Sequence, residues 1–218
     1  MEAPKVEIIE EGKFVTLKVH NCRTMYAHVA EPRRDKKNIP TGYSCDLLVP
    51  KGAPGIEQAK EKVRSMGISA FKGPGWKCPI IKDGDKAYEE FVNGGGDKND
   101  KMKLLWRGHY IISGNSTARD RSTRELIPVP YKGNVYSGCF ASAKFNVKDY
   151  DFIDDKTGMR CFGIKGYLEG IVFKADGERL GRSVTIDDLG EAGVSTQGPV
   201  DSYQEPPTAE QSYEPDPW

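Results

Sequence analysis

The sequence lacks the marks of a membrane protein and of a disulfide or zinc scaffold. No run approaches the roughly 20 apolar residues that a membrane-spanning helix needs, and the charged opening, residues 1–12, has no apolar stretch of the signal-peptide kind. The five cysteines are far apart, without the close pairs that structural zinc sites use. We therefore expect a cytosolic protein with reduced, mostly buried thiols, no metal, no cofactor and no membrane contact.

Apolar residues are also scarce. Only 37% of the 218 residues are hydrophobic, and the mean hydropathy is −0.60. Such values indicate that part of the chain does not contribute to a core. The length suits one β-domain with extensions better than two large domains.

Basic residues are absent from the end of the chain. Lys and Arg total 32, as do Asp and Glu, yet no Lys or Arg follows Arg182, whereas eight acids do. The neutral total is thus a cancellation between a basic body and an acidic end. A basic body suits a polyanionic ligand, and an acidic end can compete with that ligand or recruit other proteins.

Residues 183–218 are predicted to form a disordered, Pro-rich acidic tail, and residues 1–182 the folded domain. A tail that only aids solubility is the simpler alternative. Exposed aromatic residues, however, carry much of the energy of short recognition segments. We therefore expect Trp218, together with Glu214 and Asp216, to bind partner proteins.

Alternating apolar residues predict five strands in the body. The strands cover residues 13–31, 43–49, 104–113, 135–150 and 160–174, with a bend or bulge at Asn21 and Cys22. One helix is predicted from Pro54 to Gly67, and residues 72–102 read as an elaborated loop region. This pattern predicts a mainly β protein: a five-stranded OB-type β-barrel with one short helix and long loops.

The strand from Val135 has two faces of opposite character. One phase is small or apolar, as the interior of a small barrel requires, and the other carries Tyr136, Phe140 and Lys144. Rings on which bases stack, beside cations that contact phosphates, are what a single-strand binder needs. The next strand repeats the pattern with Lys165 and Tyr167. The alternative is that these aromatic rings pack beneath a loop.

Further candidate DNA-binding residues lie on other segments. Tyr26, in phase with His28, and Arg33 belong to the first strand and its loop, and Arg107 lies in the third strand. Trp76 and Lys77 follow a Gly-Pro turn and could cover a bound strand. Local packing of Trp76 is the alternative.

Several short segments carry a resemblance to a known family. They are Tyr26–Pro32, Tyr43–Ser44, Leu47–Lys51, Asp83–Asp85, Gly108–Tyr110, Tyr136–Phe140 and Gly177–Gly181. On them the chain resembles phage-encoded single-stranded-DNA-binding proteins, which are related in fold to the helix-destabilising proteins of T-odd phages. Two positions depart from the family pattern, since Phe140 stands where Tyr is expected and the tail ends in Trp218 instead of Phe.

The resemblance implies an OB fold and sequence-tolerant binding of single-stranded DNA during phage replication or recombination, in the host bacterial cytoplasm. It also implies an acidic C-terminus that competes with DNA and contacts replication or recombination proteins. The sequence leaves open whether the protein is a monomer or a homodimer.

Two other functions are weaker readings of the same residues. Asp83 and Asp85, or the acids between Asp149 and Asp155, could serve a metal-dependent nuclease, but both groups read first as turns. Another phage OB-type module, such as an oligosaccharide binder, would also present aromatic rings, but it would not need a basic body. We therefore expect a binding protein and not an enzyme.

Overall fold

A computed structural model describes residues 2–11, 14–71, 75–78, 80–154 and 157–180, which belong to one compact unit, Met1–Gly181. The predicted tail lies outside the described residues. The strands are β1 (Lys5–Glu11), β2 (Phe14–Arg34), β3 (Pro40–Pro50), β4 (Ile81–Asp83), β5 (His109–Ser116), β6 (Tyr131–Lys132), β7 (Phe140–Ile153) and β8 (Arg160–Ala175). The helices are α1 (Ile56–Ala70), α2 (Gly84–Asn93) and α3 (Lys101–Leu104).

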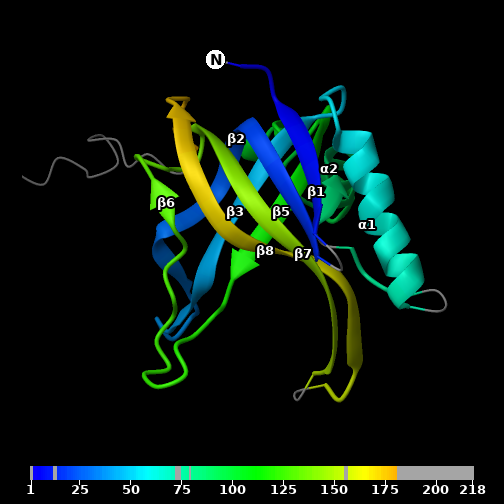
Figure 1. Ribbon diagram of the computed structural model, residues 1–218. Coiled ribbons are helices and arrows are strands. Elements are labelled where there is room, and N and C mark those ends of the chain that lie inside the picture. Colours follow the sequence, from blue (N-terminus) through cyan, green and yellow to red (C-terminus); the bar gives the residue numbers. More distant parts are fainter. Residues whose placement is uncertain (1, 12–13, 72–74, 79, 155–156, 181–218) are drawn as a thin grey trace, which may run out of the picture. The chain divides into compact units, whose positions relative to one another are not determined.

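Five strands close into a barrel (Figure 1). The antiparallel order β5-β3-β2-β7-β8 is closed by a parallel pairing between β5 and β8, at Gly114 with Gly166 and Asn115 with Tyr167. The predicted five-stranded OB-type barrel is confirmed. The predicted bend in β2 is confirmed as well: Asn21 has a φ of 54°, and the register with β7 shifts between Val19 and Cys22.

The barrel interior is filled from alternate positions of each strand, as the period of two requires. Phe145 of β7 is fully buried, with Leu17, Leu47, Ile112 and Ile164 around the same core. Gly114 leaves room for the Phe145 ring, because a Cβ at Gly114 would lie 2.3 Å from it. The inward phase predicted for β7 is confirmed.

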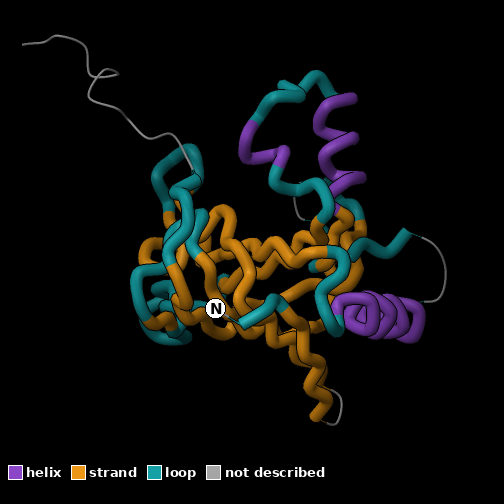
Figure 2. Tube along the Cα trace, turned by 90° about the horizontal axis from the view of Figure 1, so that it is seen from above, coloured by secondary structure: helices purple, strands orange, loops and turns teal. Residues whose placement is uncertain are grey.

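Helix α1 overlaps the predicted helix but begins at Ile56 and continues past Gly67 to Ala70, and it buries Ile56, Ala59 and Val63. The loop predicted over 72–102 is only partly right, because it contains β4, α2 and α3. Asp83 begins α2 by accepting hydrogen bonds from the backbone N–H groups of Asp85 and Lys86. In Figure 2 helices α2 and α3 stand apart from the strands.

Two strands begin later than the sequence predicts, and one strand is additional. The third predicted strand begins at His109 instead of Leu104, and the fourth begins at Phe140 instead of Val135. Strand β1 was not predicted, and it pairs with the first half of β2. None of the helices in the described part is long and apolar enough to span a membrane.

Candidate nucleic-acid interface

One row of outward side chains runs round the barrel in cross-strand register. Neighbours of these residues along each strand, such as Cys45, Gly114 and Phe145, are buried inside, so the row lies on the outer surface. From β2 through β3, β5, β8 and β7 back to β2, the row is His28, Ser44, Asn115, Tyr167, Asn146 and Thr16. We call these six residues the belt. All five barrel strands contribute to it.

Tyr167 is the aromatic centre of the belt. Its half-buried ring lies beside two cations, with Lys165 Nζ 4.6 Å and Lys148 Nζ 5.8 Å from the ring centroid. Lys148 also lies 5.9 Å from the ring of Phe14, which is largely exposed at the start of β2. An open ring with cations on its flank can stack a base while the cations contact the adjoining phosphates.

Beside Tyr167 the surface is hollowed over β2, β3, β4, β5 and β8. The hollow has a volume of about 380 Å³. It is lined by Tyr26, His28, Arg33, Ser44, Asp46, Lys82, Ser113, Gly114, Asn115, Lys165 and Gly166. The second and third strands of an OB barrel, here β3 and β5, are those on which OB folds bind oligonucleotides and oligosaccharides.

The charges in the hollow are unevenly placed. Burial raises the pKa of the Asp46 carboxyl, and a hydrogen bond from Ser113 and the charges of Lys82 and Arg33 oppose that shift. Burial, and then the charge of Arg33, lower the pKa of His28, so its ring is mainly neutral at pH 7. The cations of the hollow are therefore Arg33, Lys82 and Lys165, and its one acid, Asp46, is largely buried.

Two side-chain amides flank Tyr167 with open hydrogen-bonding capacity. Within the described part of the chain, the buried Oδ1 atoms of Asn115 and Asn146 have no hydrogen-bond partner. Asn146 Nδ2 donates to Glu169 Oε1 at 3.0 Å, which fixes this amide beside the ring. A buried acceptor without a partner is costly, so these two amides are places where the belt has unsatisfied polar atoms.

The hollow ends against the inserted helices. Tyr26, with a φ of 48°, accepts a hydrogen bond from Lys103 Nζ at 2.8 Å. Lys103 Nζ also lies 4.0 Å from the ring centroid of Trp106. Of the predicted DNA-binding residues, Tyr26, Arg33, Lys165 and Tyr167 thus lie at the belt or the hollow.

Trp76 lies outside the belt and the hollow, because its side chain packs against helix α1. Its ring lies against Gly67 of α1, so closely that a Cβ there would be 2.4 Å away. Helix packing thus accounts for this side chain, and the structure does not present it as a cover for a bound strand. Lys77 adds its backbone to the edge of β8 opposite Gly163, with its side chain exposed.

Tyr136 and Phe140 lie near the end of β8, away from the hollow. The Tyr136 hydroxyl lies 2.9 Å from Asp176 Oδ1, and Arg179 covers the ring at 4.2 Å. Phe140 lies close to Gly177. Contacts at the end of β8 therefore place Tyr136 and Phe140 outside the belt.

Lys144 and Arg107 also lie off the belt. Lys144 forms an ion pair with Glu169 at 2.8 Å on the outer wall of β7. Arg107 lies before β5, 5.6 Å from the ring centroid of Tyr88. The predicted partner-binding residues Glu214, Asp216 and Trp218 fall outside the described residues.

Sequence reasoning did not single out Phe14, Lys82 and Asn115. Lys82 lay in a region read as loop, and Asn115 lay beyond the predicted end of its strand. Only the polar phase of residues 111–115 could have indicated Asn115. Phe14 was read as part of an ordinary strand.

The acids that suggested a nuclease are engaged in other contacts. Lys51 Nζ lies 2.7 Å from both Asp83 Oδ1 and Asp85 Oδ2, and Asp151 is paired with Arg160. Among the described residues, no group of three or more His, Cys, Asp or Glu side chains is placed to hold a metal ion.

The strands define an OB-fold barrel, and cations lie beside the belt on its outer surface. The model of the family described as "Enterobacter phage Enc34, ssDNA-binding protein" matches residues 15–197. The chain belongs to this family of phage single-stranded-DNA-binding proteins. As the sequence predicts, it is therefore a member of a non-enzymatic family.

Individual proteins are also similar to this chain. Putative protein p50 of Acyrthosiphon pisum secondary endosymbiont phage 1 is 26% identical over 172 residues, which cover 74% of this chain and 84% of p50. A C-terminal truncation of the bacteriophage Enc34 single-stranded-DNA-binding protein has the same fold, with a TM-score of 0.51, 20% identity and coverage of 83% of this chain and all of that one. The Enc34 protein in complex with ssDNA matches at a TM-score of 0.49 and 20% identity, over 82% of this chain and all of that one.

Proposed function

We propose that this protein coats phage single-stranded DNA during replication or recombination in the host bacterial cytoplasm, and that the belt and the hollow are its binding surface. The observation that carries the proposal is the belt itself. Five strands bring the half-buried Tyr167 ring and the amides of Asn115 and Asn146 into a single row on an OB face, and Lys148 and Lys165 lie beside the ring. Membership of a family named for this ligand supports the same conclusion.

The proposed contacts divide into stacking and charge. A base stacks on Tyr167, and Phe14 offers a second ring next to Lys148. Phosphates lie beside Arg33, Lys82 and Lys165, which line the hollow, and beside Lys148, which flanks the Tyr167 ring. None of these contacts requires a particular base, so binding tolerates any sequence.

The affinity for oligo-dT should fall steeply with salt. Four phosphate contacts on a single strand give a slope of about −3 in log K against log salt, or about 50-fold weaker binding at 200 mM than at 50 mM. Fluorescence anisotropy of a labelled oligonucleotide measures this directly, whereas tryptophan quenching is a poor reporter because Trp76 packs on α1. A control, Arg64→Gln on α1, should leave the slope unchanged. Salt-independent binding would instead favour an oligosaccharide-type module.

The acidic tail is proposed to compete with DNA and to recruit replication or recombination proteins through Glu214, Asp216 and Trp218. Deleting residues 183–218 removes eight negative charges and no positive ones, and should tighten oligo-dT binding several-fold at low salt. The matched control keeps the tail and replaces its eight acids by Asn or Gln, which should tighten binding equally. Equal affinities for the full chain and both variants would exclude competition.

A further inference from the structure

Beyond the barrel, β7 and β8 continue as a two-stranded arm over residues 149–153 and 160–164 (Figure 1). Near its tip three large apolar side chains are unusually open, with Phe152 55%, Ile153 66% and Met159 66% exposed. Apolar side chains gathered at one exposed place indicate an interaction site. The arm is also acidic, because Asp149, Asp151 and Asp154 outnumber its one described base, Arg160.

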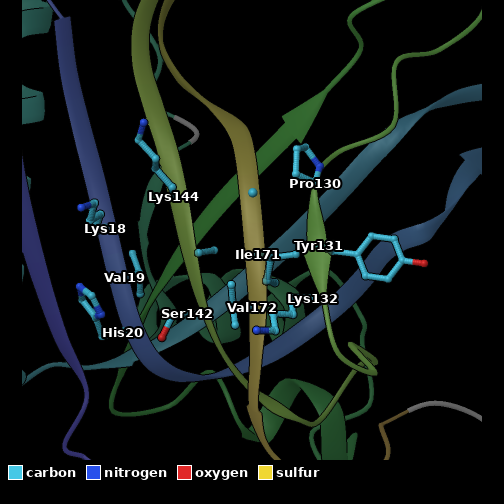
Figure 3. Close-up of a pocket in the computed structure, with 12 residues that line it drawn as sticks. Lys18, Val19, His20, Pro130, Tyr131, Lys132, Ser142, Lys144, Ile171 and Val172 are labelled. Atoms are coloured by element: carbon cyan, nitrogen blue, oxygen red, sulfur yellow. The ribbon is translucent and has the colours of Figure 1, made fainter.

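A groove of about 400 Å³ lies on the outer wall where β2, β7, β8 and β6 run side by side (Figure 3). Small residues, Ser142 and Gly170, open its floor, and Val172 adds exposed apolar surface. The lining carries Lys18, Lys132 and Lys144 and no carboxylate.

Two of these lysines are available to a ligand. Lys144 is paired with Glu169, and His20 at the groove edge lies 3.2 Å from Glu7. Lys18 and Lys132, in contrast, form no ion pair within the described part of the chain. The groove is thus apolar along its floor and positively charged at its rim, which is complementary to the acidic, apolar-tipped arm.

The arm cannot enter the groove of its own chain. Both features lie on the same antiparallel pair of strands, which runs from Lys144 opposite Gly170, through one register shift before Phe145, to Ile153 opposite Arg160. Nine residues of strand separate the groove from the tip, or about 30 Å. The arm would have to break this ladder to fold back. An arm that docks in the groove must therefore come from another molecule.

We propose that the arm of one copy of this protein docks in the groove of a second copy. Phe152 and Met159, which share one face of the arm, would lie on the apolar floor, and the acids of the arm would face Lys18 and Lys132. Each copy has one arm and one groove, so the contact is head-to-tail and can repeat without closing. The contact itself needs no DNA, but its use in lining up copies along a strand rests on the proposed function.

Two one-sided variants of the full chain test the contact in sedimentation velocity without DNA. The arm variant is Phe152→Asp with Met159→Asp, and the groove variant is Lys18→Glu with Lys132→Glu. The unmodified protein should sediment faster as its concentration rises, whereas each variant alone should stay monomeric. An equal mixture of the two should form dimers and nothing larger, because only one intact arm and one intact groove remain per pair.

Three results would overturn the proposal: a monomeric unmodified protein, a variant that still forms chains by itself, or a mixture that stays monomeric. Ile39→Asp, which charges an exposed apolar residue elsewhere, is the matched control and should associate normally. Circular dichroism verifies that each variant is folded. Tyr167→Ala separates the two proposals, since it should lose DNA affinity and keep self-association.

Discussion

Replacing Tyr167 with alanine is expected to weaken the binding of a short oligo-dT by roughly five- to 150-fold. The ring is the open aromatic surface at the centre of the belt, and stacking contributes about 1–3 kcal/mol per base. The loss should appear at both low and high salt, because stacking is not ionic. Fluorescence anisotropy titrations at two salt concentrations measure it.

Two matched variants make this result specific. Tyr167→Phe keeps the ring and should bind within about twofold of the unmodified protein. Tyr131→Ala removes a tyrosine that is 49% exposed but lies off the belt, on β6, and should also bind normally. If Tyr131→Ala weakened binding as much as Tyr167→Ala, the belt would not be the principal surface.

Replacing Phe145 with alanine should lower the free energy of unfolding by about 3–5 kcal/mol. The ring is fully buried in the centre of the barrel, and the glycine at position 114 is shaped around it. Removing the ring leaves a cavity that the closed strands cannot collapse to fill. Chemical denaturation followed by circular dichroism gives the change.

The control for this variant is Phe152→Ala, on the same strand. Phe152 is 55% exposed, so its removal should change stability by less than about 1 kcal/mol. Tyr167→Ala should likewise unfold near the normal midpoint. A similar, small loss for Phe145→Ala would mean that Phe145 is not the centre of the core.

Much of the barrel could be predicted because alternation is a local signal. The inward phase of β7 and the bend at Asn21 follow from residues close together in the chain. Helix α2 was missed because it lies within a stretch rich in Gly, Lys and Asp and buries only Gly84. Strand β1 was missed because its charged residues hide the alternation.

The site was harder to predict, because it depends on which strands become neighbours. Sequence phase shows that Tyr136, Lys144 and Tyr167 avoid the interior, but not which of them share a surface. Tyr136 precedes β7 and contacts Asp176 instead of joining the row. Tyr167 and Asn115 become neighbours only through the parallel closure of β8 on β5.

The parallel pairing of β5 with β8 is also the shortest pairing between barrel strands. It has two residue pairs, whereas β7 and β8 have fourteen. Tyr167 and Asn115 stand on opposite sides of this seam. An oligonucleotide bound to both Tyr167 and Asn115 would span the β5–β8 pairing, at which the barrel opens most easily. Bound DNA would then stabilise the pairing of β5 with β8. The DNA-bound protein would therefore resist opening of the barrel at the place where the free protein opens first.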